Sequence, residues 1–294
     1  RQRGLHAPVS RVYTGFMQRV FGPVPSRRLG RSIGVNNIPP KVCSYSCVYC
    51  QLGRAIEMAA ERREFFDPDE LAAEAQTHLA AARARGDRVD YLTVVPDGEP
   101  TLDANLGRLV WALKTLGVPV ALITNSSLIG YPAVRNELQD LDWISLKVDA
   151  ADRETWKRVD RPHKNLDFNR MRAGMLEFAE SFGGTLTTES MLVEGVNDAE
   201  AQIDGIASVL SELEPETAYI SIPTRPPAEK WVKPAPEHHI AYAYSRMREL
   251  GVHAENLIGY EGNEFAVSGD AREDLLGISA VHPMRHDAVE EIGR

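Results

Sequence analysis

The chain has 294 residues, of which 43% are hydrophobic and 26% are charged, and its formal net charge is −9. These values are ordinary for a soluble globular protein with a sizeable core. No apolar run approaches the roughly 18 residues of a membrane helix, and residues 1–6 contain no apolar signal core, so we expect a cytoplasmic protein without a membrane partner. The acidic balance argues against a broad nucleic-acid surface, because phosphate contacts require clustered Lys and Arg.

Strands and helices alternate along the chain after a mixed N-terminal segment, residues 1–22, which we expect to be an arm. Apolar runs predict six strands, at 32–36, 91–95, 118–123, 143–149, 185–193 and 218–222. Composition and helical spacing predict helices at 68–84, 106–116, 132–139, 166–182, 199–213 and 237–250. Six such units indicate a buried parallel sheet in an α/β fold, either a partial barrel or an open doubly wound sheet. We expect one domain over 23–255 and a less regular extension over 256–294, packed on it.

Polar side chains follow each predicted strand at the point where the strand ends. They are Cys43, Cys47 and Cys50, then Asp97, Gly98 and Glu99, then Thr124 and Asn125, then Lys147 and Asp149, then Glu189 and Glu194, and finally Thr224 and Arg225. In parallel α/β sheets the functional site lies at the carboxyl ends of the strands. The sequence therefore predicts that these groups converge on one site.

Cys43, Cys47 and Cys50 are the only cysteines in the chain. Three thiols within eight residues form neither a disulfide framework nor a complete four-cysteine zinc site. A cubane iron–sulfur cluster held by three thiolates leaves one iron open, and an open metal position is where chemistry takes place. The alternative is a structural or regulatory zinc protein in which one histidine supplies the fourth ligand.

A basic stretch precedes the cysteines and contains Arg27, Arg28 and Arg31 among Gly and Ser residues. Such a charge run is either a solvated face or a strand that contacts an anion. It leaves a third class open, a nucleic-acid-binding module without catalysis.

The cysteine spacing, with Tyr49 just before the last cysteine, resembles the cluster loop of the radical S-adenosylmethionine (SAM) superfamily. Gly98-Glu99 is similar to the Gly-Glu motif of that superfamily. Residues 25–53, 97–102 and 124–128 resemble more narrowly the wyosine-synthase-like iron–sulfur oxidoreductases. The resemblance runs from about residue 20 to residue 285.

The resemblance implies a partial (β/α)6 barrel of parallel strands that holds a [4Fe–4S] cluster and SAM. Cys43, Cys47 and Cys50 would each bind one iron, and SAM would chelate the fourth. An electron passed from the reduced cluster to the sulfonium would release a 5′-deoxyadenosyl radical, which takes a hydrogen atom from a substrate. A flavodoxin or a ferredoxin-type protein would supply the electron.

The resemblance also assigns roles around SAM. Gly98 and Glu99 would hold the methionine ammonium, and Asn125 would bond the ribose or the methionine carboxylate. Tyr49 would pack by the adenine, and Thr224 belongs to the same cofactor site.

Trp143, Ser145 and Lys147 alternate on one face of the fourth predicted strand. A lone cation inside a barrel is costly unless it is paired. We expect Lys147 either to pair with Asp149 or Glu189 or to contact the methionine carboxylate, with Ser145 beside it. Lys147 and Glu189 are the candidate catalytic residues, with Glu189 reaching the ribose or the substrate.

The substrate does not carry over from the resemblance. Wyosine synthases hold an auxiliary cluster with further cysteines, and this chain has none outside Cys43–Cys50. RNA base modification is the favoured substrate class, ahead of a protein or peptide and of a small metabolite. Arg161 and His163, after the fourth strand, are candidates for the substrate end, as is His282 in the tail.

Overall fold

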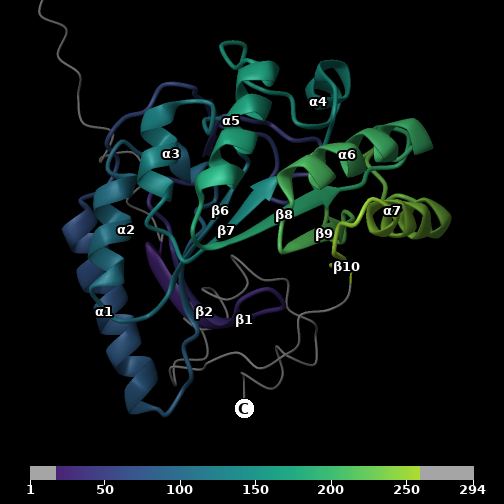
Figure 1. The fold of residues 1–294 in the computed structure, drawn as a ribbon. Coiled ribbons are helices and arrows are strands. Elements are labelled where there is room, and N and C mark those ends of the chain that lie inside the picture. Colours follow the sequence, from purple (N-terminus) through teal and green to yellow (C-terminus); the bar gives the residue numbers. More distant parts are fainter. Residues whose placement is uncertain (1–17, 259–294) are drawn as a thin grey trace, which may run out of the picture.

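The computed structural model describes residues 18–258, which form a curved sheet whose outer face is covered by helices (Figure 1). The strands of this sheet are β1 (Val20–Ser26), β2 (Gly30–Val35), β5 (Tyr91–Val94), β6 (Val120–Thr124), β7 (Trp143–Lys147), β8 (Thr185–Met191), β9 (Thr217–Ser221) and β10 (Ala254–Asn256). They lie in the order β1-β2-β5-β6-β7-β8-β9-β10, and all neighbours pair in parallel except β1, which is antiparallel to β2. The α/β fold with a partial, unclosed barrel is thus confirmed.

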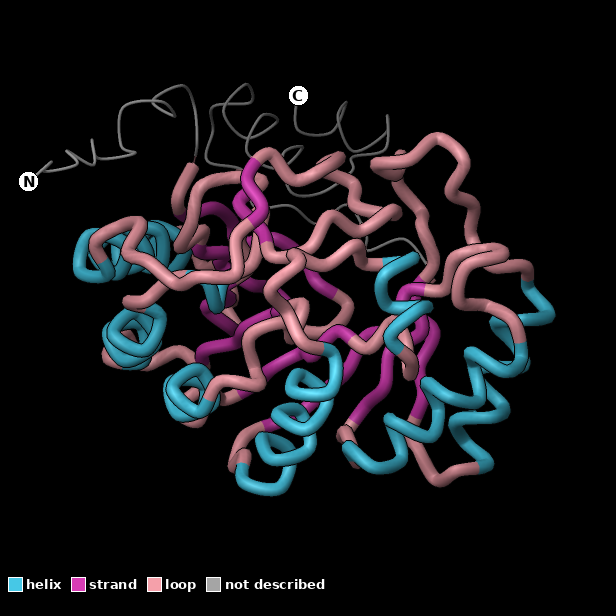
Figure 2. Tube along the Cα trace, turned by 90° about the horizontal axis from the view of Figure 1, so that it is seen from above, coloured by secondary structure: helices cyan, strands magenta, loops and turns pink. Residues whose placement is uncertain are grey.

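Helices follow the strands and pack outside them, as the arc in Figure 2 shows. They are α1 (Pro68–Ala84), α2 (Leu106–Lys114), α3 (Pro132–Leu138), α4 (Arg153–Val159), α5 (Phe168–Ser181), α6 (Glu200–Leu213) and α7 (Glu237–Glu249), with a 3-10 turn at Pro100–Leu102. A separate pair of two-residue strands, β3 (Val42–Cys43) and β4 (Glu57–Met58), lies in the cysteine loop. None of the helices between residues 18 and 258 has the length and hydrophobicity to cross a bilayer.

Three elements of the main sheet and its surrounding helices were not predicted, and neither were the short strands β3 and β4 or the 3-10 turn. Strand β1 contains Gly22, Pro23 and Pro25, which read as turn residues, but an edge strand tolerates proline because one side of its backbone needs no partner. Strand β10 is only three residues long. Helix α4 was also missed, although Asp152 caps it by accepting from two backbone N–H groups.

The predicted boundary between an N-terminal arm and the barrel, at residue 22, falls inside strand β1. The predicted C-terminal extension and His282 lie outside the described residues, apart from residues 256–258.

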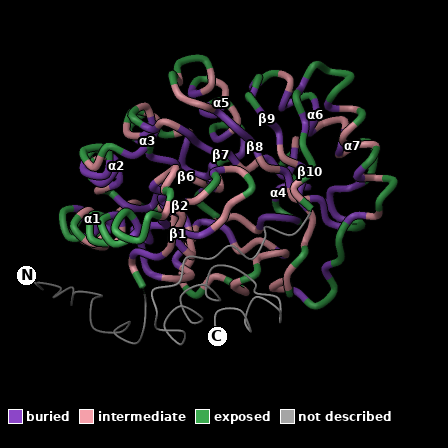
Figure 3. The backbone as a smooth tube through the Cα atoms, turned by 90° about the horizontal axis from the view of Figure 1, so that it is seen from below, coloured by how far each residue is buried: buried purple, intermediate pink, exposed green. Residues whose placement is uncertain are grey.

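The alternation of side chains along each strand separates two apolar layers. On β7, Ile144 and Leu146 join the large core between the sheet and the helices, whereas Trp143 packs on the inner side with Leu29 and Ala121. Figure 3 shows the buried strands at the centre and the exposed outer faces of the helices. Lys147 shares the inner face with Trp143, so the strand directs it into the barrel.

The tip of the β1–β2 hairpin reaches across the inner face of the sheet to its other edge. Leu29 packs against Ala121 and Trp143, on the central strands β6 and β7. Arg27 Nη2 donates to the carbonyl oxygen of Leu257, just after β10, at 3.2 Å. The hairpin therefore covers part of the gap that the unclosed barrel leaves.

We expect Gly34→Ala to destabilise the protein by about 1–3 kcal/mol, because an added methyl overpacks the site. Gly34 pairs with Phe21 across the hairpin, and a Cβ at Gly34 would lie 2.0 Å from the Phe21 ring. Gly183→Ala is the matched control, since a Cβ there meets nothing within 4 Å. Urea unfolding measures both variants, and equal free energies of unfolding would contradict the packing of β1.

Candidate active site

The cysteine loop is held between the end of β5 and the segment that follows α4. On one side, Lys41 N donates to Asp97 O at 2.6 Å and Glu99 N donates to Val42 O at 3.2 Å. On the other side, Val48 N donates to Val159 O at 2.9 Å. Backbone hydrogen bonds on both flanks thus fix the loop against the carboxyl ends of the strands.

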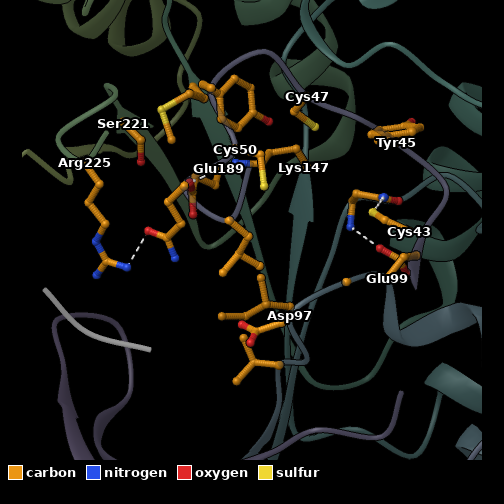
Figure 4. Close-up of a pocket in the computed structure, with 18 of the residues that line it drawn as sticks. Cys43, Tyr45, Cys47, Cys50, Asp97, Glu99, Lys147, Glu189, Ser221 and Arg225 are labelled. Carbon is orange, nitrogen blue, oxygen red and sulfur yellow. Dashed lines mark hydrogen bonds and ion pairs between the residues drawn. The ribbon is translucent and has the colours of Figure 1, made fainter. Parts of the chain in front are cut away.

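The loop and the strand ends enclose a cavity of about 380 Å³. Nearly all the side chains predicted at the site line it, namely Cys43, Cys47, Cys50, Tyr49, Gly98, Glu99, Asn125, Lys147, Glu189 and Thr224. Figure 4 shows Cys43 and Glu99 toward one side of this cavity and Ser221 and Arg225 toward the opposite side. The convergence that the sequence predicts is therefore observed.

Three of the residues that were predicted to converge on the site do not line the cavity, namely Ser145, Asp149 and Glu194. Ser145 is buried on β7, two residues before Lys147 on the same face. Strand alternation predicted the face correctly, but Ser145 lies one layer deeper in the barrel, so it is not in contact with the cavity. Arg161 and His163 do not line the cavity either.

Glu99 is a buried carboxylate surrounded by neutral donors, and its side chain is 1% exposed. Its Oε1 accepts from the Thr101 hydroxyl at 2.5 Å and from the Thr124 hydroxyl at 2.6 Å, and its Oε2 accepts from Asn125 N at 2.8 Å. Burial raises the pKa of Glu99 although these hydrogen bonds oppose the shift. No Lys, Arg or His among residues 18–258 forms an ion pair with it, so this carboxylate is suited to a cationic ligand group.

Gly98 allows the closest approach between β5 and the cysteine loop. A Cβ at this position would lie 2.1 Å from Val42 O and 2.9 Å from Ile38 Cδ1. Only glycine fits here without moving the backbone that carries Cys43. Its role is therefore to bring the sheet and the loop together.

Asn125 joins the end of β6 to the cysteine loop. Its Nδ2 donates to Ser44 Oγ at 2.9 Å and lies 3.6 Å from Cys43 Sγ. Its side chain is thus engaged with the loop, while its backbone N–H is held by Glu99.

Lys147 and Glu189 form an ion pair on the cavity wall, with Nζ and Oε1 3.0 Å apart. This is one of the two outcomes expected for Lys147. The other carboxylate oxygen, Oε2, accepts from Arg28 Nη1 at 2.6 Å, and all three side chains are less than one fifth exposed. Burial alone would raise the pKa of Glu189, but Lys147 and Arg28 outweigh it and lower the pKa to about 2.

Tyr49 connects this ion-pair group to two buried acids. The centroid of the Tyr49 ring lies 5.1 Å from Lys147 Nζ. Its hydroxyl bonds Asp149 and lies 3.4 Å from Asp160 Oδ1. Asp160 Oδ1 in turn lies 3.4 Å from Cys47 Sγ. The aromatic ring beside the last cysteine therefore has a fixed position.

Arg28, Met191 and Ser221 line the cavity and were not predicted as part of the site. Ser221 is the last residue of β9, whereas the predicted strand ran to residue 222. A strand predicted to end at Ser221 would have placed this residue among the polar groups at the carboxyl ends. It also hydrogen-bonds Glu189 and helps to lower the pKa of that carboxyl. Arg28 carries no such signal, because a hairpin brings it to Glu189 across 161 residues of sequence.

The cysteine thiols suit a cluster better than a single ion. All three are free and border one cavity, and burial raises the pKa of Cys43 to about 12, so a metal must displace the proton. Among residues 18–258, no three Cys, His, Asp or Glu side chains are grouped closely enough to hold one metal ion. In a cubane each thiolate binds a different iron, and three thiols that border one cavity are the set that such a cluster needs. The zinc alternative also needs a histidine beside the thiols, and none of residues 18–258 supplies one.

The alternative of a nucleic-acid module built on the basic stretch is also not supported. Arg28 is bound by Glu189 inside the cavity, and Arg31 pairs with Asp87 at 3.7 Å. The arginines of this stretch therefore do not form one common surface.

The comparisons with known proteins agree with this site. The family model of the radical SAM superfamily matches residues 37–204. A UPF0026 protein of Methanocaldococcus jannaschii is 43% identical over 278 residues, which cover 94% of this chain and 86% of that protein. The chain therefore belongs to the radical SAM superfamily and to the UPF0026 proteins.

Two solved structures share the fold. A radical SAM methyltransferase from Sphaerobacter thermophilus has a TM-score of 0.57 at 15% identity, covering 77% of this chain and 66% of that one. TYW1 with a lysine-pyruvate adduct bound has a TM-score of 0.51 at 13% identity, covering 74% and 73%. The predicted radical SAM superfamily is confirmed, and the likeness to TYW1 is one of fold. The protein is a radical SAM enzyme, and the cofactors of its superfamily are a [4Fe–4S] cluster and SAM.

We expect Gly98→Ala to fold but to bind its cofactors poorly, because the new Cβ pushes against the carbonyl of Val42. A clash of about 1–3 kcal/mol corresponds to a loss of about 5–150-fold in affinity for SAM. Iron per chain after anaerobic reconstitution and calorimetric SAM binding measure the effect, with Gly183→Ala as the control. Iron content and SAM affinity equal to those of the wild type would contradict this role of Gly98.

We expect Arg28→Gln to lower stability at neutral pH by about 1–3 kcal/mol, the contribution of a hydrogen bond between charged groups. The folded pKa of Glu189, about 2, lies below the ordinary value of about 4.3. Its stabilisation is therefore present above pH ~4.3 and is lost as the pH falls toward 2. The stability difference between the wild type and the variant should shrink over that window in urea unfolding of the metal-free protein.

Arg108→Gln is the control for this pH dependence, because Arg108 is exposed and lies 3.4 Å from an exposed Asp69. A difference between the wild type and Arg28→Gln that stays constant from pH 7 to pH 2 would show that Arg28 does not act through Glu189.

Proposed function

We propose that this protein is a radical SAM enzyme that abstracts a hydrogen atom from a base of an RNA substrate. The observation that carries the proposal is the size and polarity of its cavity. At about 380 Å³ it lies near the lower end of the range for small-ligand sites, about 300–1,000 Å³, so a large ligand cannot be held whole beside SAM. A macromolecule that inserts a single unit, as in base flipping, fits such a site.

The cofactors, when bound, supply reductive cleavage of SAM to a 5′-deoxyadenosyl radical. Cys43, Cys47 and Cys50 would hold the cluster as thiolates. Glu99 would accept the methionine ammonium together with the backbone carbonyl of Gly98, because it is a buried anion without a cationic partner among residues 18–258. The loop from Cys43 to Cys50 then keeps water away from the reacting atoms.

Lys147 and Glu189 would orient the ligands at the other side of the cavity. Glu189 is held in its ionised form by Lys147 and Arg28, so it would accept a hydrogen bond from the ribose or the substrate rather than exchange a proton. Lys147 uses one N–H for Glu189 and has others to offer to a carboxylate or a base carbonyl. Asn125, Tyr49 and Thr224, which border the same space, would complete the contacts to SAM.

The reducing electron would come from a flavodoxin or a ferredoxin-type protein, which places the enzyme in the cytoplasm. This part of the proposal follows from the needs of radical SAM chemistry and from three cysteines that are free thiols.

Anaerobic incubation with deuterated bulk RNA, SAM and dithionite tests the substrate class. We expect deuterium in the released 5′-deoxyadenosine, measured by mass spectrometry, because the abstracted atom ends on that product. Cys47→Ser should release no 5′-deoxyadenosine, since it lacks a cluster ligand. Arg108→Gln, a substitution on the outer face of α2, should behave as the wild type.

Deuterium that enters 5′-deoxyadenosine from a deuterated peptide pool, and not from RNA, would overturn the RNA substrate while leaving the radical chemistry in place. A protein that stays colourless after reconstitution would overturn both.

A further inference from the structure

A second hollow, of about 270 Å³, lies outside the cavity, against α4 and the segment that follows it. Its lining residues are mostly basic, and they are Arg153, Trp156, Lys157, Arg161, Pro162, His163, Lys164 and Leu166. Within the described part of the chain, no Asp or Glu lines it. Four cations around one hollow are unusual in a chain with a net charge of −9.

Three of the four Lys and Arg side chains of this hollow, all except Arg161, are only weakly neutralised. Lys157 lies 3.6 Å from Glu154, whose side chain is 82% exposed, and a pair of this kind contributes little. Arg161 is bound by Glu229 from the loop before α7. Neither Arg153 nor Lys164 forms an ion pair with a carboxylate among residues 18–258. The hollow therefore keeps a positive potential, which attracts anions.

The hollow and the cavity share a wall. Tyr45 lines the cavity and Trp156 lines the hollow, and the indole N–H of Trp156 donates to the Tyr45 hydroxyl at 2.9 Å. His163 N donates to Ser44 O at 2.8 Å, so the segment bordering the hollow is attached to the cysteine loop. A chain held at the hollow thus lies within a short reach of the cavity.

We propose that this basic hollow binds a phosphate group of the RNA backbone, next to the nucleotide whose base enters the cavity. The proposal rests on the proposed function, because an RNA substrate carries a phosphate beside every base. Lys and Arg side chains position nucleic acids through phosphate contacts without reading the sequence. The net negative chain would repel a polyanion elsewhere, so this local positive field would direct the RNA to the face that carries the cysteine loop.

The triple variant Arg153→Ala, Lys157→Ala, Lys164→Ala tests this site, since all three residues are exposed and none lines the cavity. We expect the variant to bind bulk tRNA more weakly in filter binding. The slope of log affinity against log salt concentration should be smaller by about 2, since each phosphate contact to a single strand contributes about 0.7 to that slope. Between 50 and 200 mM salt, wild-type affinity should therefore fall about 20-fold more than that of the variant.

The matched control is the triple variant Arg83→Ala, Arg88→Ala, Arg108→Ala, which removes three exposed cations on and near α1 and α2. It loses the same charge and should keep nearly wild-type affinity and salt slope. Melting curves check that both variants fold, and the double variant Lys157→Ala, Lys164→Ala repeats the test with a smaller change.

The site is overturned if wild-type protein does not bind tRNA at low salt, or if both triple variants weaken binding equally. It is also overturned if the hollow variant keeps its tRNA affinity and loses only its reduction by flavodoxin, which would assign the hollow to an electron donor. The deuterium experiment reads a different step. Loss of tRNA binding in the hollow variant together with no deuterium transfer from RNA would show that the hollow binds phosphate, but it would overturn the RNA substrate and the place of that phosphate beside a reacting base.

Discussion

The close approach of Gly98 to the carbonyl oxygen of Val42 is the constraint on which the rest of the site depends. It lets the end of β5 and the cysteine loop exchange backbone hydrogen bonds, through Lys41 N to Asp97 O and Glu99 N to Val42 O. The same turn buries the carboxylate of Glu99, which then holds the end of β6 through Asn125 N. Cluster ligands and strand ends are thereby parts of one rigid unit, which is what a preorganised site requires.

The cavity has opposite electrostatic character in two places. Glu99 is an anion with neutral donors around it, and among residues 18–258 no cation pairs with it. Glu189 pairs with two cations, Lys147 and Arg28, so the cations outnumber the carboxylate and N–H donors remain available for a ligand in this part of the wall. In the proposed function, the ammonium of SAM would match the carboxylate of Glu99, and the donors beside Glu189 would serve oxygen atoms of the ligands.

Much of this arrangement could be predicted from the sequence because it depends on local patterns. Apolar runs predicted six of the seven parallel strands. The position of sites at the carboxyl ends of parallel strands predicted the polar groups, and the cysteine spacing predicted the cluster loop. Alternation along a strand predicts the face of a side chain but not its depth within the barrel. Ser145 was therefore assigned to the correct face, but it lies below the cavity. Arg28 reaches Glu189 only because β1, an edge strand with prolines, folds as a hairpin, and no local pattern indicates that long-range contact.

The position of the basic hollow also depends on long-range contacts that the sequence does not indicate. Arg161 and His163 were noted as candidates for the substrate end of the cavity, yet the segment that carries them pairs with the cysteine loop from outside. An RNA phosphate bound there would lie against the backbone that also supports Ser44 and Val48. In the proposed function, an RNA substrate bound at the hollow would then act on the loop that carries the cluster thiols, and this contact would couple the position of the RNA to the place where the radical forms.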